Sequence, residues 1–179
     1  MKCRVVAALT VCASLLIGMI LPLSAQEDIA PFDVQAKSAV LMEAGTGKVL
    51  YAKNADQSLP PASVTKIMTL RLVMEQIDNG QLSLDETVSV SEYAASMGGS
   101  QVFLEPHEEM RCEDMLKSVV VASANDAAVA LAEIVCGSEE AFVKRMNQRA
   151  AELGMENTNF ENVTGLDDDT VDHKTSALD

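Results

Sequence analysis

The sequence predicts a mixed fold of the α/β or α+β class, in which a β-hairpin is followed by a block of helices. Two short apolar runs on either side of a glycine-containing turn indicate the hairpin. Stretches of helical composition with recognisable start and stop residues follow and indicate the helical block. The length of 179 residues suits one domain.

The hairpin is predicted from the apolar runs 38–42 and 49–52, with Gly45 and Gly47 in the turn between them. The string Gly45-Thr46-Gly47-Lys48 is similar to a phosphate-binding loop. However, its glycine spacing differs, and Val49 stands where such a loop has a serine or threonine for magnesium. We therefore predict a turn and not a phosphate site.

Two regions after the hairpin have helical composition. The first covers about residues 63–77, between the stop Pro60-Pro61 and the end signal at residues 78–80. The second covers residues 113–135, but the string 123–126 within it consists of residues that prefer caps and turns. Two helices joined by a short polar corner are therefore expected there.

A further helix is predicted over Glu139–Leu153, with Ser138 as its N-cap and Gly154 as its end. Residues 81–112 mix polar turns with isolated apolar residues, and no element is assigned to them.

The N-terminus reads as an export signal. Lys2 and Arg4 precede the apolar run 5–23, and Ser24-Ala25 stands before an abrupt change to polar residues. This pattern predicts a signal peptide over the first 25 residues, cleaved after Ala25. A retained membrane anchor is the alternative, because the apolar run is close to the roughly 20 residues that a span needs. In either case residues 26–179 would work outside the cytoplasm.

Residues 26–179 are strongly acidic, with 11 basic and 27 acidic side chains and a net charge of −16. Proteins that bind nucleic acid hold the phosphate backbone with clustered lysines and arginines. No such cluster occurs in this sequence. Nucleic acid is therefore excluded as a partner.

The cysteines and histidines point to no site. Cys112 and Cys136 would form one disulfide in an exported protein or serve as ordinary packing residues, and their spacing resembles no metal site. His107 and His173 are the only histidines, and both are expected in polar loops. Neither lies in a motif that would support a Ser-His-Asp triad.

The main candidate for chemistry is Ser63-Val64-Thr65-Lys66. Three steps along a helix amount to about 300° of rotation and about 4.5 Å of rise, so the Ser63 hydroxyl and the Lys66 amine are predicted to share a face. Serine needs a neighbouring base to act as a nucleophile at neutral pH, and a lysine whose pKa is lowered by burial can be that base. The alternative is a capping Ser63 with a solvated Lys66.

A second candidate is Ser123-Ala124-Asn125, the only Ser-x-Asn string in the chain, in the predicted polar corner. Here Ser123 would relay a proton between Lys66 and a leaving amine, and Asn125 would hold a substrate amide. The alternative is that Ser123 or Asn125 caps the next helix. A residue that caps a helix can also present a catalytic hydroxyl, so the two roles are compatible.

The two strings in this order resemble those of penicillin-binding proteins and class A β-lactamases. The surrounding sequence closely resembles the low-molecular-mass penicillin-binding proteins that are D-alanyl-D-alanine carboxypeptidases, over roughly residues 36–170. The segments that carry this resemblance are 51–56, 60–69, 99–101, 103–106, 116–128 and 162–167.

The resemblance implies a β-lactamase/transpeptidase-like fold and an exported serine carboxypeptidase at the outer face of the cytoplasmic membrane or in the periplasm. Its substrate would be a peptidoglycan stem peptide ending in D-Ala-D-Ala, and β-lactams would acylate it. In that family Ser63 would be the nucleophile and Lys66 its base. Ser123 would be the proton relay, and Asn125 would orient the substrate. No metal or organic cofactor is implied.

One departure from the family concerns its third motif, a Lys-Thr-Gly on a later strand that binds the substrate carboxylate and lines the oxyanion hole. Lys174-Thr175-Ser176 lacks the glycine, follows Asn125 too closely and is expected in a polar turn, while residues 176–179 are expected to open a helix. Residues 26–179 are therefore expected to be the N-terminal part of a catalytic domain. The remaining strands and a membrane-associating tail would be missing, and little or no activity is expected from this part alone.

Two other functions stay open. A class A-like β-lactamase would share the nucleophile but needs a glutamate-containing loop that positions the hydrolytic water, and Glu161-Asn162 is the only candidate for it. A non-catalytic peptidoglycan-binding module would keep the fold without the chemistry.

Overall fold

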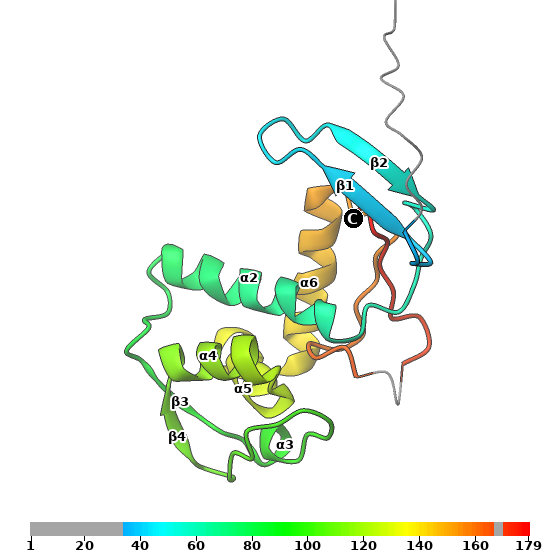
Figure 1. Ribbon diagram of the computed structural model, residues 1–179. Coiled ribbons are helices and arrows are strands. Elements are labelled where there is room, and N and C mark those ends of the chain that lie inside the picture. Colours follow the sequence, from blue (N-terminus) through cyan, green and yellow to red (C-terminus); the bar gives the residue numbers. More distant parts are fainter. Residues whose placement is uncertain (1–33, 167–169) are drawn as a thin grey trace, which may run out of the picture. The chain divides into compact units, whose positions relative to one another are not determined.

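The computed structural model describes residues 34–166 and 170–179 (Figure 1). The chain divides into two units, Met1–Gln35 and Ala36–Asp179, and the described helices and strands lie in the second. The predicted signal peptide lies outside the described residues. In chain order the elements are β1 (Ala39–Met42), β2 (Val49–Lys53), the 3-10 helix η1 (Ala62–Thr65), α2 (Lys66–Asp78), β3 (Thr87–Ser89), α3 (Glu92–Ala95), β4 (Glu109–Arg111), α4 (Cys112–Ala122), α5 (Asn125–Cys136) and α6 (Glu139–Leu153).

The predicted hairpin is confirmed. β1 and β2 pair antiparallel, with Ala39 opposite Lys53. In the turn, the Glu43 carboxylate accepts hydrogen bonds from the backbone N–H groups of Gly45 at 2.8 Å and Thr46 at 2.7 Å. Hydrogen bonds from the Thr46 hydroxyl and from these two amides lower the pKa of Glu43. A carboxylate of the chain itself thus occupies the amides that a phosphate would need.

Helix α5 is the centre of the helical block. Its residues from Asn125 to Ala132 are all buried, and it contacts α2, α3, α4, α6 and β3. In Figure 1, α2 lies above α4 and α5 in the view. The apolar faces of α2, α4, α5 and α6 therefore meet in one core. Its largest fully buried side chains are Phe142, Leu72, Met115, Leu131 and Met146.

The predicted corner and the predicted capped helix are also confirmed. Ser123, directly after α4, adopts a left-handed conformation with φ 55°, and α5 begins at Asn125. The Ser138 hydroxyl accepts a hydrogen bond from the Ala141 N–H at 3.2 Å, and Gly154 follows α6 with φ 76°. These local signals correctly mark where helices start and stop.

The helix expected from Ser63 begins in another way. Its first turn, Ala62–Thr65, is the 3-10 helix η1, and the α-helix starts only at Lys66. Such tighter turns are common at helix N-termini, and sequence patterns do not separate them from α-helix. The predicted position of the element is right, whereas the type of its first turn is wrong.

Residues 81–112, which the sequence left unassigned, contain a second small sheet and a short helix. β3 and β4 pair antiparallel, with Val88 opposite Met110. Only Val88 is buried in β3, between exposed Thr87 and Ser89. A three-residue strand with one buried side chain is too short to show the alternation that identifies a strand in the sequence.

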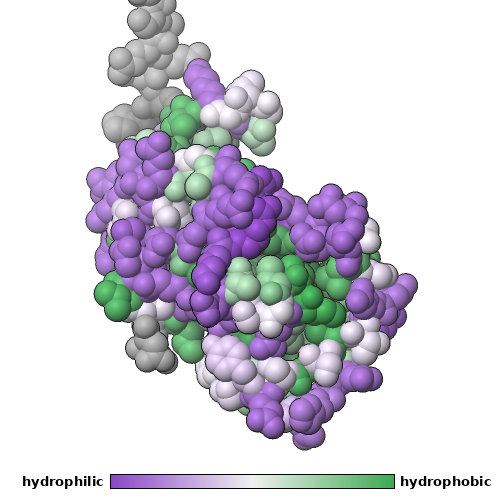
Figure 2. All heavy atoms as spheres, turned by 180° about the vertical axis from the view of Figure 1, so that it is seen from behind, coloured by the Kyte–Doolittle hydropathy of each residue, from purple (hydrophilic) through white to green (hydrophobic). Residues whose placement is uncertain are grey.

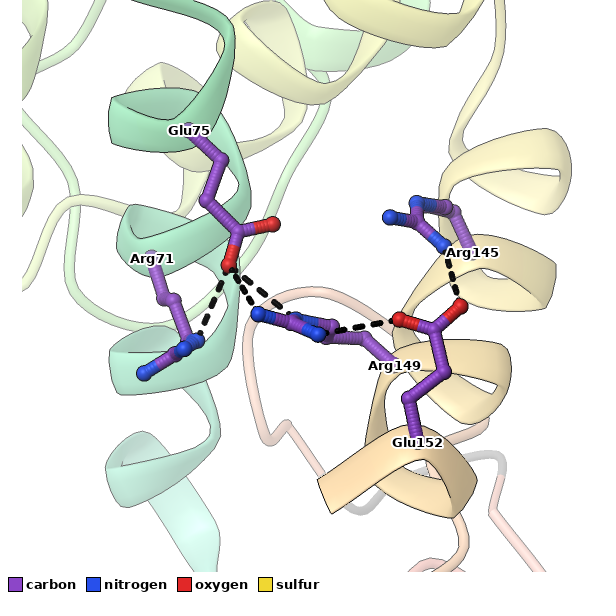
Figure 3. Close-up of polar contacts among 5 residues, drawn as sticks. All are labelled: Arg71, Glu75, Arg145, Arg149 and Glu152. Carbon is purple, nitrogen blue, oxygen red and sulfur yellow. Dashed lines mark hydrogen bonds and ion pairs between the residues drawn. The ribbon is translucent and has the colours of Figure 1, made fainter. Parts of the chain in front are cut away.

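Ion pairs connect α2 to α6 (Figure 3). Arg149 on α6 binds the Glu75 carboxylate on α2 at 2.9 Å, and Arg71 binds the same oxygen at 3.1 Å. Glu152 accepts from Arg149 at 3.0 Å and from Arg145 at 3.1 Å. The network is only partly exposed, so water and salt screen it less than an isolated surface pair, and it holds α6 beside α2.

Both Cys112 and Cys136 are free thiols, so the disulfide that the sequence left open is not formed. Burial raises the pKa of each thiol.

Hydrophobic side chains reach the surface among polar ones on the face shown in Figure 2. In the part of the chain that the structure describes, no helix has the length and apolar character required to span a membrane.

The end of the chain differs from expectation. Lys174 and Thr175 do not lie in a polar turn, because they form isolated antiparallel bridges with Asn159 and Leu59. The Ser176 hydroxyl accepts from the Asp179 N–H at 3.2 Å, as an N-cap would, but residues 176–179 are not helical.

The core makes a quantitative prediction on α2. Leu72 is 1% exposed and Met74 is 41% exposed. We expect Leu72→Ala to lower the free energy of unfolding by about 3 kcal/mol, because it removes buried methyl groups and leaves a cavity. Met74→Ala, two residues away, should cost less than about 1 kcal/mol. Urea unfolding followed by circular dichroism measures both. Equal losses in the two variants would contradict this description of the core.

Candidate functional site

Ser63 and Lys66 lie together at the junction of η1 and α2. Ser63 is exposed, whereas Lys66 is 4% exposed, and Lys66 Nζ lies 3.4 Å from Ser63 Oγ. Lys66 Nζ also donates a hydrogen bond to the Thr164 carbonyl oxygen at 2.7 Å. No side chain caps η1 or α2. The alternative of a capping Ser63 with a solvated Lys66 is therefore wrong.

Burial changes the acid–base properties of this lysine. It lowers the pKa of Lys66 to about 8, because the ammonium form loses hydration. At pH 7 about one amine in ten is then neutral, compared with fewer than about one in a thousand for an ordinary lysine. A neutral amine can keep one N–H on the Thr164 carbonyl and present its lone pair to the Ser63 hydroxyl. The pair can thus act as a base and a nucleophile.

The carbonyl that holds Lys66 belongs to a tight turn at residues 162–165. The Asn162 side-chain oxygen accepts from the N–H groups of Thr164 at 3.1 Å and Gly165 at 2.6 Å. The Thr69 hydroxyl donates to the Val163 carbonyl at 2.7 Å. The turn therefore presents two successive carbonyls to the first turns of α2.

Gly165 lets this turn approach η1 closely. Its φ is 76°, and a Cβ placed there would lie 1.8 Å from the Ala62 carbonyl oxygen and 2.8 Å from Thr65 Oγ1. Only a residue without a side chain fits at this position. The close approach therefore brings the turn that carries the Thr164 carbonyl directly against η1.

Asn125 lies at the start of α5 and is 4% exposed. Its Nδ2 donates to the Gly98 carbonyl at 2.7 Å, while its buried Oδ1 has no hydrogen-bond partner among the described residues. A Cβ at Gly99 would lie 2.8 Å from Asn125 Nδ2 and 3.5 Å from Leu166 Cδ1. Asn125 and Leu166, the residue after the turn that holds Lys66, therefore flank the same glycine.

Ser123 is half-buried between α4 and α5. Neither Ser123 nor Asn125 caps α5, because Ala124 occupies the N-cap position and no side chain accepts there. Within residues 34–166 and 170–179, no hydrogen bond joins the Ser123 hydroxyl to Ser63 or Lys66. The structure thus pairs Ser63 with Lys66 directly and leaves Ser123 without a direct bond to that pair.

Three comparisons identify the family. The sequence model of the D-alanyl-D-alanine carboxypeptidase family, Peptidase_S11, matches residues 24–179. The chain belongs to this family.

Relatives and solved structures agree with this assignment. The D-alanyl-D-alanine carboxypeptidase DacF of Bacillus subtilis is 57% identical over 145 residues, which is 81% of this chain. DacC of Escherichia coli is 39% identical over 150 residues, or 80% of this chain. The crystal structure of DacD from Francisella tularensis is 39% identical, with a TM-score of 0.80 over 86% of this chain. The crystal structure of penicillin-binding protein 5 from Haemophilus influenzae is 35% identical, with a TM-score of 0.79 over 84% of this chain. The predicted fold class is confirmed.

The match covers only part of each relative. This chain spans 37% of DacF, 38% of DacC and 38% of the DacD structure, and 44% of the penicillin-binding protein 5 structure.

Within this carboxypeptidase-family site, the sequence did not predict the role of Asp126. Its carboxylate is fully buried and accepts from the N–H groups of Val102 at 3.2 Å, Leu104 at 3.1 Å and Ala127 at 2.9 Å. These bonds hold Phe103 in a left-handed conformation, with φ 61° and 80% exposure. An acidic residue in the first turn of a helix was the available signal, but nothing local indicates the distant loop that it binds.

His107 lies in an exposed turn, as expected, whereas the contacts of His173 and Glu161 needed the structure. His173 lies outside helices and strands, as expected, but it is buried, because it is 5% exposed and its Nε2 lies 2.7 Å from Thr65 Oγ1. The Glu161 carboxylate, the candidate for a β-lactamase-like base, accepts from the N–H groups of Val171 at 2.7 Å and Asp172 at 2.9 Å. It therefore has a structural role in this fold. The described ranges hold no cluster of three metal-binding side chains.

The close approach at Gly165 can be tested against a matched glycine. Gly154 has the same φ of 76°, but a Cβ there meets nothing within 4 Å. Gly154→Ala should lower the free energy of unfolding by about 1–2 kcal/mol, the cost of a left-handed alanine. Gly165→Ala should cost about 1–3 kcal/mol more, because the turn and η1 must separate. Urea unfolding measures the difference, and equal losses would show that no close contact exists at Gly165.

Proposed function

We propose that this chain carries the nucleophile and base of a serine-type D-alanyl-D-alanine carboxypeptidase that acts on peptidoglycan stem peptides. The observation that carries the proposal is a buried amine, Lys66, beside an exposed hydroxyl, Ser63, on a chain of this family. A lysine in a purely structural role would gain nothing from losing its hydration.

In the proposed reaction, Ser63 Oγ attacks the carbonyl carbon of the D-Ala-D-Ala peptide bond while the neutral Lys66 amine takes the hydroxyl proton. The tetrahedral intermediate collapses, the C–N bond breaks, and the leaving D-alanine amine receives a proton from Lys66 through the Ser123 hydroxyl. An ester on Ser63 remains. Water then attacks this ester, the hydroxyl of Ser63 is restored and the shortened stem peptide is released.

Asn125 would orient the substrate through its side-chain oxygen. Its nitrogen is already bound to the Gly98 carbonyl, whereas Oδ1 is a buried acceptor without a partner among the described residues. An amide N–H of the bound peptide is the kind of group that would satisfy it.

The same attack on the strained amide of a β-lactam would leave a penicilloyl ester on Ser63. One related solved structure, penicillin-binding protein D2 of Listeria monocytogenes, is described in the ampicillin-bound form and has a TM-score of 0.71 at 31% identity. We also propose export to the cell envelope, because the signal-like N-terminus and the wall-directed substrate both require it.

Acylation of Ser63 is the direct test. Incubation of this chain with a fluorescent penicillin should give a covalent adduct that peptide mass spectrometry places on Ser63. The adduct should form more slowly than on the longer Bacillus subtilis relative, because no Lys-Thr-Gly motif occurs in these 179 residues. Ser63→Ala should abolish the adduct, while Ser83→Ala, at an exposed turn, should not change it. An adduct that persists in Ser63→Ala would contradict the proposed nucleophile.

The pH dependence of this acylation tests the base. The pKa of Lys66 is lowered to about 8, so below pH 8 the protonated form dominates and cannot accept the Ser63 proton. We expect the acylation rate to rise about tenfold per pH unit below pH 8 and to level off above it. In Lys66→Arg the guanidinium keeps the positive charge but cannot be deprotonated. This variant should therefore be acylated very slowly at every pH, without the rise in rate towards pH 8. A rate that does not vary between pH 6 and 9 would show that Lys66 is not the base.

A further inference from the structure

His173 is buried between the turn that carries Ser63 and the segment that leads to Thr164. Its Nε2 lies 2.7 Å from Thr65 Oγ1, and its Nδ1 accepts a hydrogen bond from the Glu161 backbone N–H at 3.0 Å. The Phe160 ring meets the imidazole edge to face, with 5.9 Å between the ring centroids. Both ring nitrogens are therefore engaged by different segments of the chain.

These contacts determine the tautomer of His173. A backbone N–H can only donate, so Nδ1 must carry a lone pair, and the ring must be neutral. The proton of the neutral ring then lies on Nε2, which donates it to Thr65 Oγ1. Protonation of Nδ1 would bring two donors together and break the bond to Glu161.

The two hydrogen bonds of His173 lie at one end of a line of buried polar contacts that joins the first turns of η1 and α2 to residues 161–165. Thr65 stands between Ser63 and Lys66 in sequence, and Glu161 begins the segment that ends at Gly165. Between the same two regions, Lys66 donates to the Thr164 carbonyl at 2.7 Å, and Thr69 donates to the Val163 carbonyl at 2.7 Å. His173 adds a third connection, at the Ser63 end of the line.

We propose that His173, as its neutral Nε2–H tautomer, is a positioning residue that holds the Ser63–Lys66 turn against residues 161–165. It thereby keeps the Lys66 amine dehydrated and directed at Ser63. It does not touch the substrate. Among the described residues, the Glu161 carboxylate binds the amides of residues 171 and 172, and Asp172 pairs with Lys174 at 2.7 Å. The inference rests on the proposed function only where it concerns acylation.

The test compares two substitutions at Thr65. Thr65→Ser keeps the acceptor oxygen, whereas Thr65→Val has nearly the same shape without it. Lysine ¹³Cε NMR of the full chain reports the pKa of Lys66 directly, without any need for activity. We expect values near 8 in the unsubstituted chain and in Thr65→Ser. In Thr65→Val the pKa should rise by at least about one unit towards its ordinary value, a tenfold loss of neutral amine at neutral pH.

A third variant separates the two contacts of the histidine. In His173→Asn, the side-chain oxygen can still accept from Glu161, but the amide is too short to reach Thr65, so the pKa of Lys66 should rise as in Thr65→Val. Long-range ¹⁵N spectra of the unsubstituted chain should show His173 with its proton on Nε2. Circular dichroism checks that each variant is folded. If one variant does not fold, the pKa of Lys66 in the other variant and the tautomer of His173 decide the test.

The outcomes distinguish this inference from the proposed function. An Nδ1–H tautomer, or an unchanged pKa of Lys66 in folded Thr65→Val and His173→Asn, would overturn the positioning role even if Ser63 is acylated. A shifted pKa in a chain whose Ser63 never reacts with penicillin would support the positioning role and overturn the proposed function. If both hold, penicillin acylation at pH 7 should be about tenfold slower in Thr65→Val than in Thr65→Ser.

Discussion

The burial of one amine is the constraint on which the rest of the site depends. Lys66 must lose water for its neutral form to be available near pH 8, and it must remain within reach of Ser63. A buried amine without any partner would be costly, and the Thr164 carbonyl offsets this cost by accepting one N–H. A carbonyl carries no formal charge, so it orients the amine without the strong preference for the ammonium form that a carboxylate would impose.

The dry environment needs two surfaces that meet at backbone distance. The turn at residues 162–165 reaches η1 because Gly165 has no Cβ, and the Asn162 side chain fixes the turn in that shape. On the other side, α2 is held by its apolar face against α5 and by the Glu75–Arg149 ion pair to α6. The helical core therefore sets the position of the lysine, and the turn encloses it.

Local sequence patterns were enough for the parts of this arrangement that are local. The hairpin, the polar corner at Ser123, the Ser138 cap and the shared face of Ser63 and Lys66 all follow from residues within a few positions of one another. The partners of the first turns of α2 do not. Lys66 and Thr164 are 98 residues apart, and Thr65 and His173 are 108 residues apart. No periodicity or capping rule links such positions, so the segments that bury Lys66 and His173 could not be identified from the sequence.

The energetics of the buried polar groups favour a site over a structural element. A buried acceptor such as Asn125 Oδ1, which has no hydrogen-bond partner among the described residues, costs about 1–3 kcal/mol, and the dehydration of Lys66 adds a second penalty in the same region of the fold. Apolar residues at both positions would pack without either cost. Elsewhere in the same helix, the buried Asp126 carboxylate is fully used by three backbone amides. The fold can therefore satisfy a buried polar group where only structure is at stake, and under the proposed function a substrate amide would satisfy Asn125 Oδ1.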